Sequence, residues 1–193
     1  VLRQDPNIVL VGEIRDLETA EIAMEAGQTG HYVLSTIHTI NSIEVITRLR
    51  KLGISDYDIA STLATAVSQR LVRRVCPKCA QKRLFTEEEK MKINKYAKKY
   101  NLEFDFTDKY TYDVIGCKEC NMTGYSGRIA IIEILTLTDK IKELVMDGKS
   151  TFEIRKAALE EGFLPFEMDG IKKVVDGKIT LQELNNKTLL FNS

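Results

Sequence analysis

The sequence predicts an α/β fold, and three consecutive patterns near its start indicate this class. Residues 8–11 (IVLV) are an uninterrupted apolar run, which is typical of a strand buried on both faces. Residues 16–26 follow with the pattern of a helix, and residues 32–37 form a second apolar run. Two such runs separated by a helix predict two buried parallel strands joined by a crossover helix.

Polar residues follow both apolar runs and are the first candidates for chemistry. Gly12 and Glu13 close the first run, and His38 closes the second. We expect these side chains at the carboxyl ends of neighbouring strands, where ligands bind in open α/β sheets. A carboxylate there can orient a water molecule for attack, and an imidazole can stabilise charge that develops on a phosphate. The alternative for Glu13 is an ordinary surface residue, because short apolar runs followed by an acid are common.

The residues around these runs have simpler assignments. Asp16 can cap the helix over residues 16–26, and Gly27 is placed to end it. If both histidines lie on one strand, His31 and His38 are roughly 23 Å apart, because each residue of a strand advances about 3.3 Å. We therefore expect a structural role for His31.

Two further helices are expected before the cysteines. Asn41 and Ser42 can cap a helix that ends before Gly53. Its apolar face would contain Ile43, Ile46 and Leu49. A second helix is expected over residues 56–68, and residues 69–75 either extend it or form a strand.

Four cysteines form two CxxC pairs and predict a metal centre. The ligands would be Cys76, Cys79, Cys117 and Cys120. Two residues between paired thiolates allow one turn to place both sulfurs on one ion, and two turns complete a tetrahedron. With four thiolates no coordination position remains for water, so a structural Zn²⁺ is expected. The alternatives are an iron bound by the same ligands and four free thiols.

The segment between the cysteine pairs is rich in lysine. A helix over residues 87–100 is expected, opened by Thr86 with Glu89 in the register of a capping box. Its basic residues are Lys90, Lys92, Lys95, Lys98 and Lys99, and an earlier basic cluster contains Arg70, Arg73 and Arg74. These clusters form either solvated helix faces or a docking patch.

The last third of the chain predicts a strand and a helical subdomain. A glycine turn over residues 124–127 leads to a strand over residues 128–135, and three short helices follow. Two capping boxes are expected, Ser150 with Glu153 and Thr180 with Glu183. The helix ends are expected at Gly148, Gly162 and Gly177.

Composition limits the class of partner. The 193 residues contain 28 basic and 28 acidic side chains, so no overall field attracts nucleic acid or an anionic membrane. No apolar run is long enough to span a bilayer, and no signal-peptide pattern opens the chain, which predicts a soluble, cytosolic protein. Paired cysteines in such a chain fit metal binding better than disulfides.

Several motifs occur together in the order found in one family. RQDP at residues 3–6 followed by IVLVGEIRD resembles a Walker B region, and TGHYVLSTIHT resembles the histidine box that follows it. SQRLVRR, the CxxC pairs and GCKECNMTGYSGRIAIIE continue the likeness. The sequence thus resembles the type II secretion and type IV pilus assembly ATPases.

The resemblance implies a fold and a set of roles. Residues 1–75 would be the C-terminal half of a RecA-like P-loop ATPase domain, 76–122 an inserted zinc lobe, and 123–193 a strand with the helical subdomain. Glu13 and His38 would be catalytic, with ATP and Mg²⁺ as substrate and cofactor. Nucleotide binding or sensing would involve Gly12, Arg15, Ser35, Thr36 and Arg70. The pattern GxxxxGK(S/T) does not occur in the chain, so this fragment is expected to be inactive alone.

The resemblance also implies partners. It suggests a homohexamer at the cytoplasmic face of the inner membrane, in peripheral association with the platform and cytoplasmic-domain proteins of a secretion or pilus machine, and no specific nucleic acid. It does not separate type II secretion from pilus or competence systems. In the family an Asn commonly follows the His-Thr pair, but here Ile40 takes that position. Two other functions stay open, a zinc-ribbon nucleic-acid binder and a non-catalytic interaction module.

Overall fold

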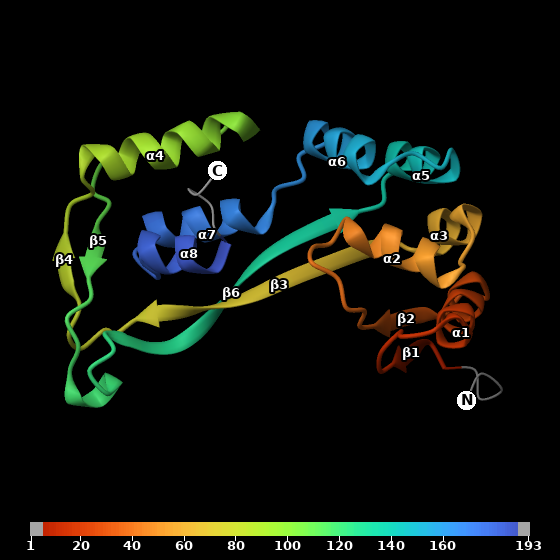
Figure 1. Cartoon of the computed structure of the whole chain (residues 1–193), viewed down its shortest axis with the longest axis horizontal. Helices are drawn as coiled ribbons and strands as arrows, with labels where there is room; N and C mark the ends of the chain where they lie inside the picture. Colours follow the sequence, from red (N-terminus) through yellow and green to blue (C-terminus); the bar gives the residue numbers. More distant parts are fainter. Residues whose placement is uncertain (1–5, 189–193) are drawn as a thin grey trace. The chain divides into compact units, whose positions relative to one another are not determined.

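The computed structural model describes residues 6–188, which form two compact units (Figure 1). The first unit contains the chain up to Ser68 together with Ile134–Phe163. The second unit contains Gln69–Glu133 and the chain from Leu164 onward. Each unit is therefore built from two separate stretches, whereas the sequence motifs suggested three consecutive segments. Part of the Walker B resemblance, residues 3–5, lies outside the described residues.

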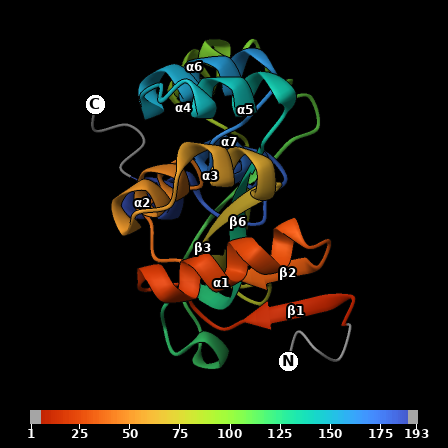
Figure 2. The same ribbon diagram turned by 90° about the vertical axis from the view of Figure 1, so that its right-hand side faces the viewer.

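The first unit opens with the expected pair of parallel strands. Strand β1 (Ile8–Val11) pairs with β2 (Tyr32–Ser35), and the crossover is helix α1 (Leu17–Gln28). Figure 2 shows α1 alongside both strands. The register runs from Ile8 opposite Tyr32 to Val11 opposite Ser35. The two strands consequently end side by side, which brings the residues that follow them together.

The prediction that both faces of these strands are buried is wrong. Val11 and Val33 pack against the core of the first unit, whereas Ile8, Leu10 and Tyr32 are 64%, 77% and 78% exposed. The apolar run therefore alternates between inward and outward side chains, as in a strand with one covered face. Helix α1 supplies that one cover.

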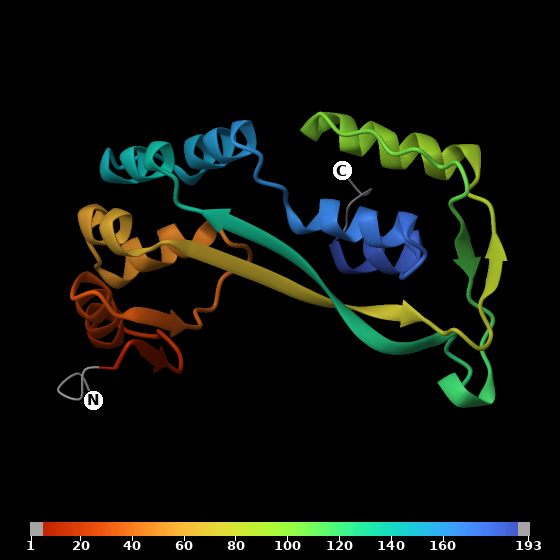
Figure 3. The ribbon, with the colours of Figure 1, turned by 180° about the vertical axis from the view of Figure 1, so that it is seen from behind.

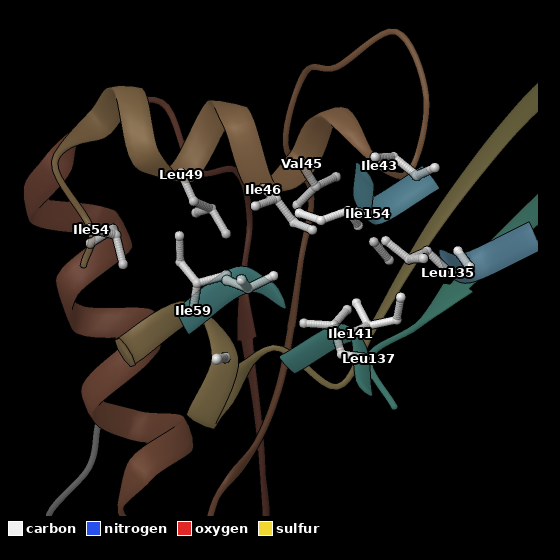
Figure 4. Packing of buried hydrophobic residues seen from close by; sticks show 14 of the residues in the cluster. Ile43, Val45, Ile46, Leu49, Ile54, Ile59, Leu135, Leu137, Ile141 and Ile154 are labelled. Atoms are coloured by element: carbon white, nitrogen blue, oxygen red, sulfur yellow. The ribbon is translucent and has the colours of Figure 1, made fainter. Parts of the chain in front are cut away.

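The core of the first unit lies between helices from both of its stretches. The helices are α2 (Glu44–Leu52), α3 (Asp56–Thr62), α5 (Asp139–Met146) and α6 (Thr151–Glu160). Figure 4 shows Leu49, Ile59, Ile141 and Ile154 directed into a common interior, and all four side chains are almost completely buried. Gly53 ends α2 in the left-handed conformation, as expected.

Two glycine assignments differ from the sequence prediction. Helix α1 does not end at Gly27 but continues to Gln28. A Cβ at Gly27 would lie 2.3 Å from Cγ2 of Thr62, so this glycine allows α1 and α3 to approach closely.

Gly124 and Gly127 have positive φ angles of 74° and 73°, but residues from Tyr125 onward are strand and do not form the expected turn. Left-handed glycines occur in strand bulges as well as in turns, so the spacing of these glycines alone did not distinguish a turn from a strand.

Two long strands, β3 (Thr65–Val75) and β6 (Tyr125–Thr136), pair with each other, and the boundary between the units falls within both. The strand alternative for residues 69–75 is therefore confirmed. The helix expected over residues 56–68 was too long, because α3 ends at Thr62 and Leu63 is already extended. Pairing with β6 outweighs the helical spacing of the apolar residues.

The second unit contains the cysteine-rich lobe. Strands β4 (Gln81–Arg83) and β5 (Thr111–Asp113) form an antiparallel pair beside helix α4 (Glu87–Ala97), as Figure 3 shows. The capping box of α4 is present, with Thr86 and Glu89 as its members. Short 3-10 helices occur at Lys98–Tyr100 and Lys118–Cys120.

The C-terminal helices do not form one subdomain. The described residues contain four helices after β6, not three, because α7 (Phe166–Val175) and α8 (Leu181–Thr188) follow α5 and α6. Helices α5 and α6 belong to the first unit, and α7 and α8 to the second. The spacing of apolar residues along one helix does not indicate which core that helix joins. The single helical C-terminal subdomain is thus not confirmed.

Candidate functional site

The residues that follow β1 and β2 form the candidate site of the first unit. Oε2 of Glu13 lies 2.6 Å from Nη2 of Arg15, and Oε1 of Glu13 lies 3.0 Å from Nε2 of His38. The Glu13 side chain is 23% exposed, while Arg15 and His38 are open to solvent. The structure thus brings together a carboxylate and an imidazole at the carboxyl ends of two parallel strands.

Hydrogen bonds between the two segments after the strands fix the backbone of this site. The amide of Ile14 donates to the carbonyl of Thr36 at 2.8 Å, and the hydroxyl of Thr36 donates to the carbonyl of Gly12 at 2.8 Å. Asp16 accepts from the amide of Thr19 at 2.9 Å and begins α1, as the sequence predicted. Glu13 therefore lies between a strand end that is hydrogen-bonded to its neighbour and a helix that is capped by Asp16.

The electrostatic state of Glu13 follows from its neighbours. The hydrogen bond from Arg15 lowers the pKa of the Glu13 carboxyl. Partial burial opposes this shift, and the charges of Arg15 and His38 add to it. Oε1 is buried and, among the described residues, has no hydrogen-bond partner of good geometry. An ionised carboxylate with an unsatisfied oxygen can accept a hydrogen bond from a water molecule.

The four cysteines form the candidate metal centre of the second unit. Their sulfur atoms all lie within 4.8 Å of one another. The distance from Cys120 Sγ to Cys79 Sγ is 3.8 Å, and that to Cys117 Sγ is 3.7 Å. Four thiolates at a Zn–S distance of about 2.3 Å form a tetrahedron with edges of about 3.8 Å. The donor set and its spacing therefore fit a tetrahedral zinc ion.

Backbone amides turn toward one sulfur of this centre. The amides of Cys117 and Gly124 donate to Sγ of Cys120 at 3.1 and 3.2 Å. Burial opposes ionisation, but these amide hydrogen bonds lower the pKa of Cys120 to about 6. Burial, together with the neighbouring sulfurs and against a backbone hydrogen bond from Gly116, raises the pKa of Cys79 to about 12. A bound cation would offset that penalty, because metal coordination deprotonates a thiol.

The sequence matches the family described as "Type II/IV secretion system protein" over residues 1–186. The chain belongs to this family. It is 41% identical to the type IV pilus assembly ATPase PilB of Acinetobacter baylyi, covering 97% of this chain and 31% of that protein. It is 39% identical to the type II secretion system protein E of Aeromonas hydrophila, covering 95% of this chain and 35% of that protein. The chain thus spans about a third of the length of these relatives.

Solved structures agree with the fold. The ATPase DotB of Yersinia pseudotuberculosis superposes with a TM-score of 0.63 at 23% identity, covering 98% of this chain and 38% of that one. The DotB of Legionella pneumophila gives the same TM-score at 20% identity, covering 96% of this chain and 39% of that one. The α/β fold and the family resemblance expected from the sequence are confirmed.

Within this secretion-family fold, the other predicted site residues lie in two places. The hydroxyl of Ser35 makes a long 3.4 Å contact with the carbonyl of Thr36, which also accepts from the amide of Ile14. Arg70 belongs to the second unit, where its guanidinium donates to the carbonyl of Lys187 at 3.0 Å and lies 4.2 Å from the ring centre of Phe166. A nucleotide role for Arg70 stays a prediction.

The premise that both histidines lie on one strand is wrong, because β2 spans only Tyr32–Ser35. Strand β2 begins at Tyr32, so His31 lies outside it. Nδ1 of His31 is 3.0 Å from the carbonyl of Ala26 and 3.0 Å from the hydroxyl of Thr29. His31 therefore satisfies groups at the C-terminal end of α1.

Sequence reasoning missed a buried ion pair in the second unit. The Glu183 side chain is 0% exposed and accepts from the amide of Arg73 at 3.0 Å and from its guanidinium at 2.9 and 2.6 Å. Thr180 accepts from the amide of Glu183, but the carboxylate pairs with Arg73 and does not close the expected capping box. The sequence showed only an acid at the third position of a helix. It did not indicate the ion pair, because the partner of Glu183 lies more than a hundred positions away along the chain.

The lysines of α4 lie partly in local pairs. Lys90 pairs with Glu87 at 2.7 Å and Lys92 pairs with Glu88 at 2.6 Å. Lys99, in the 3-10 helix Lys98–Tyr100 that follows α4, lies over the ring of Tyr96. These contacts agree with a solvated helix face for the three lysines concerned.

No helix of residues 6–188 is long and apolar enough to cross a membrane.

Proposed function

We propose that this chain is the hydrolytic part of a motor ATPase that drives pilus or pseudopilus assembly. Glu13 orients the attacking water, and His38 donates to the γ-phosphate. Gly12, Arg15 and Ser35 line the approach to them. Mg²⁺, bound together with ATP, would neutralise charge that develops on the transferring phosphoryl group. The domain would be of the RecA-like P-loop type.

The observation that carries this proposal is the 3.0 Å separation of Glu13 and His38. Hydrolysis of a phosphoanhydride needs a group that accepts from water and a group that donates to phosphate within a few ångströms of each other. The carboxylate is ionised. Its Oε1, the atom near His38, has no hydrogen-bond partner of good geometry among residues 6–188. Relatives named as pilus assembly ATPases support the same reaction.

The residues that hold the phosphates would come from outside this chain. A Gly-rich phosphate loop supplies backbone amides and a lysine, and its pattern does not occur here. The chain spans about a third of its relatives. We therefore propose that the chain alone hydrolyses little ATP, while the complete protein is active as a cytoplasmic homohexamer.

The cysteine centre would have a structural role in this motor. Four thiolates leave no open coordination position, so Cys76, Cys79, Cys117 and Cys120 would hold Zn²⁺ to stabilise the lobe. The lobe would contact the inner-membrane platform and cytoplasmic-domain proteins of the machine. Its exposed lysines suit acidic segments or anionic headgroups.

The test is ATP hydrolysis by the complete protein, its Glu13→Gln and His38→Gln variants, and this chain alone. We expect each variant to lower kcat by about 100-fold or more, because each removes a group used in the transition state. Glu21→Gln on the exposed face of α1 is the control and should retain activity. Unchanged turnover in Glu13→Gln would leave a non-catalytic interaction module as the better description. Steady turnover by this chain alone, absent in Glu13→Gln, would refute an external phosphate cradle.

A further inference from the structure

We propose that Thr36 is a positioning residue that fixes the backbone of Glu13 from both sides. This inference rests on the proposed hydrolytic role of Glu13. The peptide groups that flank Glu13 are both bonded to Thr36. Its hydroxyl donates to the carbonyl of Gly12 at 2.8 Å, and its carbonyl accepts from the amide of Ile14 at 2.8 Å.

These two bonds extend the strand pairing beyond the strands themselves. The last registered pair is Val11 with Ser35, so the regular ladder ends at Val11, before Gly12 and Glu13. The carbonyl of Thr36 continues a backbone ladder that any residue could provide. The bond to Gly12 comes from the side-chain hydroxyl, and an apolar side chain at this position cannot supply it.

The same bond argues against direct sensing of phosphate by Thr36. A hydroxyl has one hydrogen to donate, and that of Thr36 is directed to the Gly12 carbonyl. Phosphate oxygens at neutral pH are hydrogen-bond acceptors, so binding them would require this hydrogen bond to break. Thr36 therefore acts on the reaction through Glu13, which the sequence alone did not distinguish from nucleotide binding.

The geometry gives the bond a consequence for catalysis. A carboxylate that orients a water must be held close to its productive position, and a displacement of about 1 Å can cost about 100-fold in rate. Thr36→Val keeps the shape of the side chain but removes the donor. Thr36→Ser keeps the donor and removes a methyl group.

The first experiment measures amide hydrogen exchange of Ile14 in this chain. Loss of one hydrogen bond of ordinary strength should accelerate exchange at Ile14 by about fivefold in Thr36→Val. Thr36→Ser should exchange at about the wild-type rate. Thr29→Val is the matched control, since the Thr29 hydroxyl also donates to a backbone carbonyl, that of Glu25 at 2.9 Å. It should not change exchange at Ile14.

The second experiment measures steady-state ATP hydrolysis by the complete protein. Thr36→Val should lower kcat by about 10- to 100-fold with KM for ATP roughly unchanged, and Thr36→Ser should restore most of kcat. A rise in KM at constant kcat would instead show direct nucleotide binding and overturn the proposal. Thermal unfolding checks that the variants fold, and Thr36→Ala replaces Thr36→Val if the latter does not.

The two experiments separate two kinds of failure. Unchanged exchange at Ile14 in a folded variant without the hydroxyl would refute the positioning role, whatever the ATPase result. Accelerated exchange together with full activity of Glu13→Gln would instead refute the hydrolytic function and leave Thr36 as a purely structural contact.

Discussion

Nε2 of His38 lies 3.0 Å from Oε1 of Glu13, although the two residues follow different strands. The parallel register explains this separation, because Val11 pairs with Ser35 and both strands end at the same edge. The site is therefore a product of strand pairing and of the short segments after each strand. Backbone contacts hold its members, and they leave Arg15 and His38 open to solvent while Glu13 is partly buried.

Replacement of Arg15 by Gln should raise the pKa of the Glu13 carboxyl. The hydrogen bond from Arg15 is the largest effect on this pKa and lowers it. Burial of the carboxyl is the second largest effect and raises the pKa, but by less. Because the folded-state pKa is lowered, the ion pair contributes when the pH is above the ordinary carboxyl range and is lost as the pH falls through the folded pKa. A carbon-detected NMR titration of Glu13 in this chain measures the shift. An unchanged midpoint would show that Arg15 does not pair with Glu13 in solution.

The purified chain should contain one Zn²⁺ per molecule, bound by the four cysteines. Removal by a chelator should unfold the cysteine lobe, because binding energy at such a centre is folding energy. Elemental analysis measures the stoichiometry, and circular dichroism with thermal unfolding measures the loss of structure. Cys79→Ser should lose the metal, while Ser61→Ala in the first unit should retain it. Iron in place of zinc would keep the ligands but change the metal assignment.

Glu183→Gln should destabilise the chain by about 2 kcal/mol. The change removes a fully buried carboxylate that receives three hydrogen bonds from Arg73, and half-exposed Arg73 can recover part of the loss by hydration. Glu160→Gln is the matched control, since its pair with Lys140 at 2.8 Å is exposed. It should lower the free energy of unfolding much less than Glu183→Gln does, because solvent screens an exposed pair. Urea unfolding at neutral pH compares the two, and equal effects would contradict the importance of the buried pair.

The same ion pair predicts a pH dependence of stability. Burial opposes ionisation of Glu183, but hydrogen bonds from Arg73 lower the pKa of its carboxyl. A lowered folded-state pKa stabilises the fold at pH values above the unfolded value of about 4.3, and this stabilisation disappears as the pH falls through the folded pKa. Unfolding in urea at several acidic pH values should show a smaller pH dependence in Glu183→Gln than in the wild type. Identical slopes would exclude the contribution.

Gly27→Ala should destabilise the chain, although alanine normally favours a helix over glycine by about 1 kcal/mol. The added Cβ would lie 2.3 Å from Cγ2 of Thr62, and such overpacking costs about 1–3 kcal/mol. Thr62→Ser removes that methyl group and should suppress the effect. A double-mutant cycle by urea unfolding measures the coupling between the two positions. Independent, additive effects would mean that α1 and α3 do not pack at this distance in solution.

Local patterns predicted the parts of the site that depend on neighbours in sequence. Strand ends identified Glu13 and His38, and the CxxC spacing identified the four cysteines, because turn geometry alone places paired thiolates together. The capping box at Thr86 was also predictable, since its members are three residues apart. The same local approach failed for residues 63–68, where helical spacing and strand propensity compete and only pairing with β6 decides.

The sequence by itself determined the family, the crossover of two parallel strands and the residue types of both candidate sites. Only the tertiary structure decided that one face of those strands is exposed, that the C-terminal helices divide between two units, and that Glu183 pairs with Arg73 and does not close a capping box. The physical reason is the distance along the chain over which each kind of interaction acts. Periodicity, capping and turn spacing act over a few residues, whereas burial and ion pairing depend on which distant segment occupies the opposite side, and that contact free energy outweighs local preference.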